Sequence, residues 1–254
     1  MSNIHASAIV DPSAILAEGV EVGPFTIIHG NVRIGPGTRI GSHCELGVAT
    51  PLSDGSPLQI GSGSVIRSHS IFYEGSSFGD GLVTGHRVTV REGVRAGACL
   101  QIGTLSDLQG DCRIGSYTRL HSNVHIGKMS VIGSFVWIFP YVVLTNDPTP
   151  PSETLQGVTL EDYAVVATMS VILPGVTVGK HALVGAHACV GRNVAAHTVV
   201  AGVPAKPVAQ TDTIMLKDGS GAHAYPWTRH FHRGYPEAAV QHWLAGEHEF
   251  QWQS

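Results

Sequence analysis

Residues 102–132 read IGTLSDLQGDCRIGSYTRLHSNVHIGKMSVI, and an apolar side chain stands at every sixth position of this stretch. The same period runs from Ile4 to Leu46, from Ile60 to Leu144 and from Leu160 to Val190, with two slips in register between these runs. Of the 29 positions in the series 28 are apolar, whereas the 43% hydrophobic content would place roughly 12 there by chance. Thr84 is the single exception.

Two further columns of the repeat point to one geometry. The residue after the apolar position is glycine at 15 of the 29 sites, which suits a turn that a side chain would obstruct. The fourth residue after it is small or β-branched in many repeats, as in Ala8, Val20 and Ser64, which suits a second inward position at a crowded corner. Three six-residue units then close one coil of a triangular prism, in which each strand pairs in parallel with the strand one coil later. The sequence predicts an all-β parallel β-helix of roughly 9–10 coils and about 45 Å in length.

Composition excludes several classes of protein. The formal net charge is −4 and only 13% of the residues are charged, so no basic surface for nucleic acid is expected. The first residues show no basic segment followed by an apolar core, and no apolar stretch reaches the length of a membrane span, so we expect neither a secretory leader nor a membrane span, and we expect a cytoplasmic location. Its four cysteines are scattered without metal-site spacing and are expected to be free thiols.

The two register slips locate two loops, at residues 47–57 and 145–157. Both are rich in Pro, Asp and Ser, and a loop of this length in a strict repeat is more often functional than idle. We expect the β-helix to occupy residues 1–208 and a C-terminal extension to occupy residues 209–254. The extension is dense in histidine and aromatic residues and predicts a short helix over 236–246 that buries Val240, Trp243 and Leu244. It either caps the open end of the coil or shapes a ligand cleft.

Residues 172–208 carry a resemblance to a known family. This segment, ILPGVTVGKHALVGAHACVGRNVAAHTVVAGVPAKPV, resembles the closing coils of hexapeptide-repeat acyltransferases, which end in a G-x-P-A-K signature. Residues 84–147, with TGHRVTVRE, HSNVHIG and VVLTND, are similar to nucleotide-sugar N-acetyltransferases of surface polysaccharide biosynthesis. The opening IHASAIVDPSAILAEGVEVGPF is similar to UDP-N-acetylglucosamine O-acyltransferases.

The resemblance implies a left-handed β-helix, a homotrimer with active sites between neighbouring prisms, and acyl coenzyme A, by default acetyl coenzyme A, as co-substrate. It implies an N-acyltransferase that acts on a nucleotide-linked amino sugar, for example in lipopolysaccharide biosynthesis. The alternative within the family is a sugar O-acyltransferase of the UDP-N-acetylglucosamine type. Flat prism faces are compatible with closed threefold packing, and a cleft along the axis suits an extended pantetheine.

His86 and Asn123 are the predicted catalytic residues. His86 follows the one polar position of the apolar series and stands at the repeat offset where sugar O-acyltransferases have a catalytic histidine. A general base of this kind contributes about 10²–10⁴-fold. Asn123 matches an amide that approaches the acceptor amine in the resembled N-acetyltransferases. The alternatives are a surface histidine at a subunit contact and an asparagine in a solvated ladder.

Five further residues complete the predicted site. His121 and His125 lie in the same hexad as Asn123 and are predicted to bind substrate. Asn146 and Asp147 open the second loop where galactoside-type acetyltransferases have a catalytic histidine. Asp147 either orients a charged amine or starts an Asx-turn. Lys206, in the PAK signature, is predicted to meet a coenzyme A phosphate, unless it is only a solvated end residue.

A zinc hydratase of the γ-carbonic anhydrase type is the rival from another class. It shares the prism and uses three histidines, and His86, His121 and His125 have suggestive spacing. Their different offsets in the repeat argue against one common locus, which a metal triad requires. We expect no metal.

Overall fold

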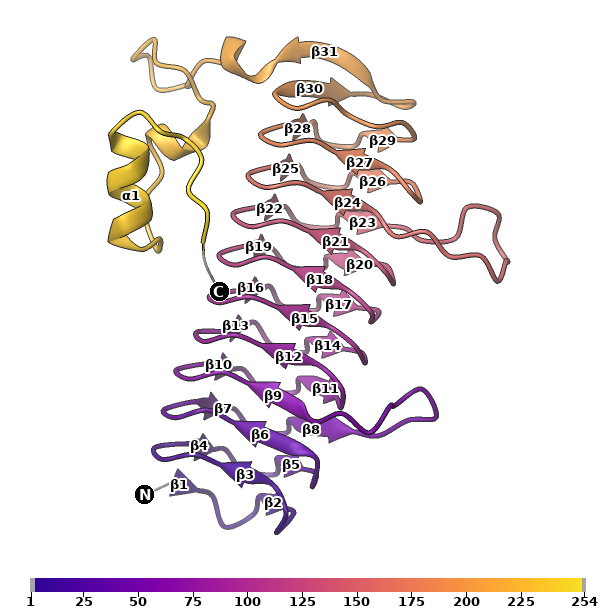
Figure 1. Ribbon diagram of the computed structural model, residues 1–254, viewed down its shortest axis with the longest axis vertical. Coiled ribbons are helices and arrows are strands. Elements are labelled where there is room, and N and C mark those ends of the chain that lie inside the picture. The colour runs from indigo at the N-terminus through magenta and orange to yellow at the C-terminus, as the bar shows by residue number, and fades with distance from the viewer. Residues whose placement is uncertain (1–2, 253–254) are drawn as a thin grey trace.

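The computed structural model describes residues 3–252 and is a parallel β-helix with three sheets (Figure 1). The prediction of pairing one coil apart is confirmed, since Asp107 pairs in parallel with His125 and Leu108 with Ile126. Sheet A contains β1 (Asn3–Ile4), β4 (Glu21–Val22), β7 (Arg39–Ile40), β10 (Val65–Ile66), β13 (Val83–Thr84), β16 (Gln101–Ile102), β19 (Arg119–Leu120), β22 (Trp137–Ile138), β25 (Val165–Val166), β28 (Leu183–Val184), β30 (Thr198–Ala201) and β31 (Lys206–Gln210).

The other two sheets form the remaining faces of the prism. Sheet B contains β2 (Ile9–Val10), β5 (Ile27–Ile28), β8 (Glu45–Val48), β11 (Ile71–Tyr73), β14 (Thr89–Val90), β17 (Asp107–Leu108), β20 (His125–Ile126), β23 (Val143–Leu144), β26 (Val171–Ile172) and β29 (Cys189–Val190). Sheet C contains β3 (Ile15–Leu16), β6 (Val32–Ile34), β9 (Leu58–Ile60), β12 (Ser77–Phe78), β15 (Arg95–Ala96), β18 (Arg113–Ile114), β21 (Val131–Ile132), β24 (Thr159–Leu160) and β27 (Thr177–Val178).

The repeated apolar residues fill the prism, as the sequence predicts. Phe72, Leu108 and Ile126 have no exposed surface and belong to one continuous core. Thr84, the polar exception, is also fully buried. Its hydroxyl accepts a hydrogen bond from the Arg67 backbone N–H at 2.9 Å, so the threonine is explained by core structure. The polar position therefore has a structural role inside the core.

The prism is longer than the predicted 9–10 coils. Strand β30 pairs in parallel with β28 and starts an eleventh turn. Its Val199 stands opposite Leu183, so this turn is two residues shorter than the usual 18-residue coil. A count of hexads misses this turn because its sequence has left the repeat. Strand β31 then pairs antiparallel with β30 and covers the edge of sheet A.

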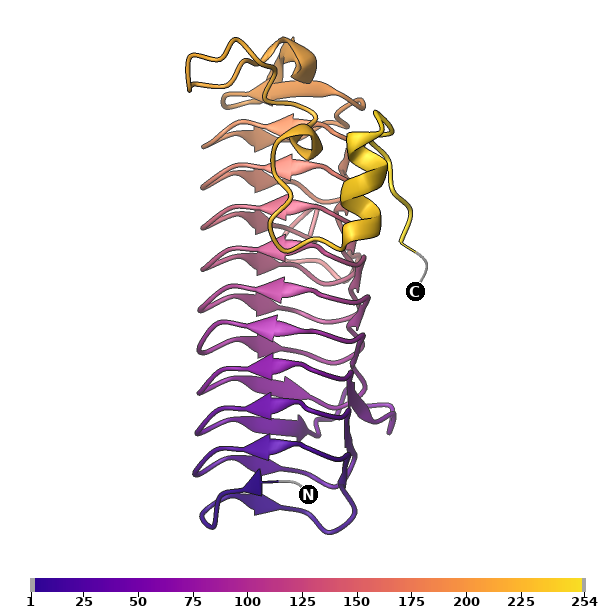
Figure 2. The same ribbon diagram turned by 90° about the vertical axis from the view of Figure 1, so that its left-hand side faces the viewer.

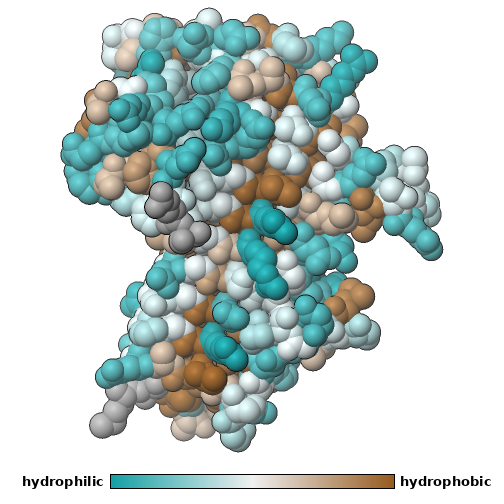
Figure 3. Space-filling model, in the orientation of Figure 1, coloured by the Kyte–Doolittle hydropathy of each residue, from teal (hydrophilic) through white to brown (hydrophobic). Residues whose placement is uncertain are grey.

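Both predicted loops leave the prism at the same corner, between sheets B and C. The first connects β8 to β9 and the second connects β23 to β24, and both project to the same side (Figure 1). Four strands of sheet B, namely β11, β14, β17 and β20, lie between them. The face seen in Figure 3 carries apolar patches separated by hydrophilic side chains.

The C-terminal extension lies along the side of the prism (Figure 2). It contains η1 (Thr211–Thr213), η2 (Trp227–Arg229) and α1 (Glu237–Leu244), and β31 runs across the predicted boundary between residues 208 and 209. The helix is shorter than predicted. Trp243 is buried as expected, whereas Leu244 is 59% exposed and Ala239 is buried in its place. Among residues 3–252, no helix has the length and apolar character that a membrane crossing requires.

A ladder of stacked rings on the prism receives this extension. Phe135 lies 5.0 Å from Tyr163 and Tyr163 lies 4.8 Å from His181, measured between ring centroids in successive coils. The Tyr163 hydroxyl accepts a hydrogen bond from the Phe250 backbone N–H at 2.6 Å. Trp243 packs edge-on against Phe135 at 5.5 Å. The extension therefore has its own small aromatic core against the prism wall.

Close approach of successive coils explains the glycine column. A Cβ atom at Gly103 would lie 2.2 Å from the carbonyl carbon of His121 in the next coil. A Cβ atom at Gly191, which has the same place in its repeat, would meet only the end of the Leu173 side chain at 3.2 Å. Backbone cannot yield as a flexible side chain can, so the two glycines differ in their tolerance of substitution.

We expect Gly103→Ala to destabilise the protein by at least about 2 kcal/mol, because the added methyl group forces two coils apart. Gly191→Ala is the matched control and is expected to stay within about 0.5 kcal/mol of the wild type. Thermal unfolding followed by circular dichroism measures both. Equal melting temperatures for the two variants would contradict the explanation by coil contact.

Candidate functional site

A cleft lies between the two loops on the outside of the prism. It has a volume of about 280 Å³ and includes Leu52 from the first loop and Asn146 from the second. The rest of its lining comes from the coils between the loops: Arg91, Glu92, Gln109, Gly110, Asp111, His125 and Lys128. We call it the interloop cleft. Two departures from a regular repeat thus meet at one set of polar side chains.

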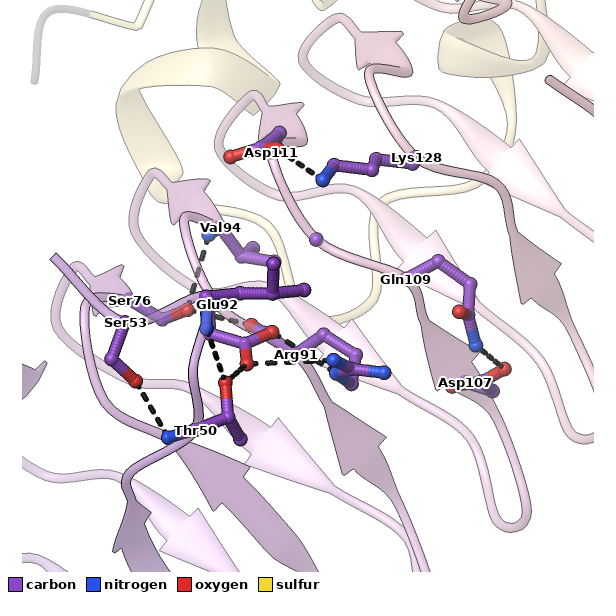
Figure 4. Close-up of polar contacts among 12 residues, drawn as sticks. Thr50, Ser53, Ser76, Arg91, Glu92, Val94, Asp107, Gln109, Asp111 and Lys128 are labelled. Carbon is purple, nitrogen blue, oxygen red and sulfur yellow. Dashed lines mark hydrogen bonds and ion pairs between the residues drawn. The ribbon is translucent and has the colours of Figure 1, made fainter. Parts of the chain in front are cut away.

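His125 and Asp107 form a pair at this cleft. They stand opposite each other on the adjacent strands β20 and β17, and His125 Nδ1 lies 3.1 Å from Asp107 Oδ2. Gln109 Nε2 donates a second hydrogen bond to the same oxygen at 2.5 Å (Figure 4). Burial opposes ionisation of Asp107, but the hydrogen bonds from His125 and Gln109 outweigh it and hold the pKa of this carboxyl below its usual range.

The tautomer of His125 follows from this pairing. An ionised carboxylate only accepts hydrogen bonds, so Nδ1 of His125 carries the hydrogen that it donates to Asp107. The lone pair of the neutral imidazole is then on Nε2. A histidine held in this way by a carboxylate has the arrangement of a general base.

Two ion pairs, Arg91–Glu92 and Lys128–Asp111, line the same cleft as His125, and Figure 4 shows both. Arg91 Nε donates to Glu92 Oε2 at 3.0 Å, and the Thr50 hydroxyl of the first loop donates to Glu92 Oε1. Lys128 Nζ lies 3.0 Å from Asp111 Oδ2. Burial opposes ionisation of Glu92, but the bonds from Arg91 and Thr50 keep the pKa of its carboxyl below the usual range. Glu92 therefore anchors the first loop beside the cleft.

The second loop is held by Asp147. Its carboxylate accepts hydrogen bonds from the backbone N–H of Thr149 at 3.0 Å and of Ser152 at 2.8 Å, and from the Ser152 hydroxyl at 2.6 Å. The Ser152 hydroxyl is the main reason why the pKa of Asp147 lies below its usual range. These contacts give Asp147 the Asx-turn role that the sequence left open, whereas Asn146 lines the cleft.

The other predicted residues lie elsewhere on the molecule. His86 is exposed at the corner between sheets A and B, with Nδ1 2.7 Å from the Ser68 hydroxyl, and borders a groove of about 590 Å³. His121 borders a separate pocket of about 390 Å³ and stacks on Phe139 at 4.7 Å. Asn123 occupies a turn with φ 59°. Lys206 is exposed on β31 beside a hollow of about 660 Å³.

The three histidines of the zinc-hydratase alternative are not brought together within one chain. His86, His121 and His125 border three different hollows. In residues 3–252 there is no group of three or more His, Cys, Asp or Glu side chains arranged to hold a metal ion. The four cysteines are unpaired, as the sequence predicts.

Sequence reasoning missed Asp107, Glu92 and Lys128. The signal for Asp107 was available, because it stands one coil before His125 in the same outward column. The ion pairs of Glu92 and Lys128 depend on a loop residue and on side-chain direction, which the repeat does not encode.

Comparison with known proteins identifies the class. Residues 13–47 match the family described as bacterial transferase hexapeptide (six repeats). The acyl-[acyl-carrier-protein]–UDP-N-acetylglucosamine O-acyltransferase of Pseudomonas entomophila is 33% identical over 218 residues, which cover 81% of this chain and 73% of that protein. The enzyme of the same name from Ectopseudomonas mendocina is 30% identical over 225 residues, covering 88% of this chain and 80% of its own. The protein is thus a hexapeptide-repeat acyltransferase.

The chain belongs to the family of these UDP-N-acetylglucosamine O-acyltransferases. The crystal structure of the Arabidopsis UDP-N-acetylglucosamine acyltransferase has the same fold, with a TM-score of 0.69 and 21% identity over 82% of this chain and 74% of its own. The relatives named here are O-acyltransferases. They support the alternative left open by the sequence better than N-acyl transfer, and their name gives an acyl-carrier protein as donor, not coenzyme A.

We expect Glu92→Gln to lower the melting temperature at pH 7, with a loss of about 1–3 kcal/mol for a charge-assisted bond whose acceptor is only 12% exposed. The folded-state pKa of Glu92 is below its unfolded value, so the carboxylate stabilises the fold above about pH 4.3 and this contribution is lost as the pH falls further. The difference from the wild type should shrink between pH 7 and pH 3.5. Calorimetry at both pH values, with exposed Glu153→Gln as control, measures it; a difference independent of pH would contradict the anchor.

Proposed function

We propose that this protein is a sugar O-acyltransferase, which moves an acyl group from a thioester on an acyl-carrier protein to a hydroxyl of UDP-linked N-acetylglucosamine or a close relative. The observation that carries the proposal is the identity of 33% over 218 residues with an enzyme of that name. The His125–Asp107 pair in the interloop cleft supports it, because hydroxyl acceptors need a base that amine acceptors need less.

The proposed reaction is a direct acyl transfer. Nε2 of His125 takes the proton of the sugar hydroxyl while the hydroxyl oxygen bonds to the thioester carbonyl carbon. The tetrahedral intermediate collapses with cleavage of the carbon–sulfur bond, and the imidazolium of His125 returns the proton to the departing sulfur. Asp107, held ionised, stabilises the imidazolium in between.

Other cleft residues have supporting roles in this proposal. Asn146 offers an amide donor and acceptor to orient the sugar. Lys128, whose side chain is 35% exposed, supplies positive charge to the developing oxyanion or to a substrate phosphate. Positioning contributes the larger share, since a thioester is already reactive toward an oxygen held close to it.

The oligomeric state belongs to the same proposal. We expect a homotrimer, in which the interloop cleft of one prism is completed by its neighbour. The flat faces of the prism are compatible with closed threefold packing. Light scattering on the purified chain measures the state directly.

We expect His125→Ala to lower kcat by about 10²–10⁴-fold in the transfer of an acyl group from acyl-carrier protein to UDP-N-acetylglucosamine. Asp107→Asn should lower kcat by a smaller factor and leave KM nearly unchanged, because it removes the carboxylate that orients the base. His29→Ala is the matched control: His29 Nε2 lies 3.0 Å from Glu45 Oε1 in a similar pair outside the cleft.

His86→Ala is measured beside these variants. A loss of kcat in His86→Ala with His125→Ala unchanged would move the base to the residue that the sequence first indicated. The product is examined by mass and by treatment with mild alkali, which cleaves an ester and spares an amide. An alkali-stable product on an amino sugar would contradict O-acyl transfer and restore N-acyl transfer.

A further inference from the structure

A pocket on the outer face of sheet A has a lining that is rich in arginine and contains no acidic residue. Its volume is about 390 Å³, and Arg67, Arg119 and Arg233 all contribute to it. Arg67 follows β10, Arg119 lies on β19, and Arg233 belongs to the C-terminal extension. The sheet A pocket is separate from the interloop cleft, with which it shares no lining residue.

The three arginines have no carboxylate partner within the described residues 3–252. Arginines and lysines elsewhere in this range do have one, such as Arg91 with Glu92 and Lys180 with Glu249. Three positive charges of the sheet A pocket are therefore left without compensation. Like charges gathered in one hollow repel one another and attract an anion.

Arg119 is prepared to receive such an anion. Its guanidinium carbon lies 4.7 Å from the ring centroid of Trp137 and 4.4 Å from that of Tyr235. One edge is occupied, because Nη2 donates to the carbonyl oxygens of Arg233 at 2.7 Å and of Gly234 at 3.3 Å. Within residues 3–252 its Nε and Nη1 donate no hydrogen bond, and arginine binds phosphate through such paired in-plane donors.

Burial of Arg119 strengthens this argument. The residue is half-buried, and burial lowers the pKa of its guanidinium, which is the mark of a charge that is desolvated without a counter-ion. The nearby charge of Arg233 acts in the same direction. A bound anion would relieve both effects.

The dimensions of the sheet A pocket indicate the size of the ligand. Arg67 directly follows β10, and Arg119 lies on β19, three strands further along sheet A. At about 4.8 Å per strand, the three steps between these two residues span about 14 Å along the prism. The floor between them offers the neutral polar groups of Gln101, Thr104 and Ser122. At the Arg119 end stand the rings of His121 and Trp137. An elongated molecule with a phosphate at one end and neutral polar groups along its length fits this arrangement.

We propose that the sheet A pocket binds the phosphate of an extended organic phosphate, either the diphosphate of a nucleotide sugar or the phosphate of a pantetheine thioester. Arg119 and Arg233 hold the phosphate oxygens at one end of the pocket, and Arg67 meets a polar or anionic group of the ligand at the other end. The choice of these two ligands rests on the proposed acyl transfer, and the site itself rests on the three arginines.

The test is isothermal titration of the full chain with UDP-N-acetylglucosamine, UDP, coenzyme A and inorganic phosphate. Arg67→Gln and Arg233→Gln, both at exposed positions, should each weaken binding of the true ligand by about 10- to 100-fold. Arg113→Gln, an exposed arginine on β18 of sheet C, is the matched control and should bind as the wild type does. Arg119 is left intact because it also ties the extension to the prism.

The ligand series separates the two sources of phosphate. Weaker binding of the UDP compounds in both variants supports the site and makes it a nucleotide site, whereas weaker binding of coenzyme A alone supports it as a pantetheine site. Unchanged affinity for all ligands in both variants would overturn the proposal. So would binding of inorganic phosphate as tight as that of UDP and coenzyme A, since the pocket would then hold only an isolated anion.

Failure of this site and failure of the proposed function have different signatures. Loss of UDP-N-acetylglucosamine binding in the variants, together with no acyl transfer by the wild type, would leave the site standing and remove the acyl transfer. Acyl transfer by the wild type together with unchanged binding in both variants would support the acyl transfer and remove the phosphate site.

Discussion

Parallel backbone pairing at a constant step of one coil is the constraint on which the other features of this protein depend. It places equivalent residues of successive coils about 4.8 Å apart, on the inside and on the outside of the prism alike. Inside, this produces continuous columns of apolar side chains. Outside, it brings polar residues together as pairs, and His125 meets Asp107 because both occupy the same outward position of adjacent strands. The ring ladder from Tyr117 to His181 has the same origin.

The repeat made the fold predictable to a degree that the site was not. A period of six identifies inward residues, and the structure buries nearly all of them. For an outward residue the period shows only which residues of other coils share its position on the prism. Which of these outward positions forms a site depends on contacts with the loops and with neighbouring side chains. His86 was selected because Thr84 interrupts the apolar series, but Thr84 is there to satisfy the Arg67 backbone within the core. A second signal is the recurrence of polar residues one coil apart, which selects the pair of Asp107 and His125.

The segments that leave the repeat, namely the two loops and the C-terminal extension, were predicted with unequal success. The two loops were located from their register slips, and they do border a polar cleft. The role of Asp147 in its own loop was open from sequence, because a carboxylate before Pro and Ser suits both a ligand and an Asx-turn. The position of the C-terminal extension was beyond reach. Its aromatic residues indicate that the extension packs against another surface, but they do not show which face of the prism provides that surface.

Arg119 links that extension to the face of sheet A. The same guanidinium donates to the backbone of Arg233 and Gly234 in the extension and borders the sheet A pocket. Interactions that share a group are thermodynamically coupled, so an anion that fixes this guanidinium also favours the docked extension. His181, in the ladder beneath, has its pKa lowered to about 4, mainly by burial. Its neutral form therefore stabilises the fold above the ordinary histidine pKa near 6.5, and this contribution is lost as the pH falls toward 4. Near neutral pH the ladder that receives the extension therefore includes an uncharged ring at His181, stacked on Tyr163.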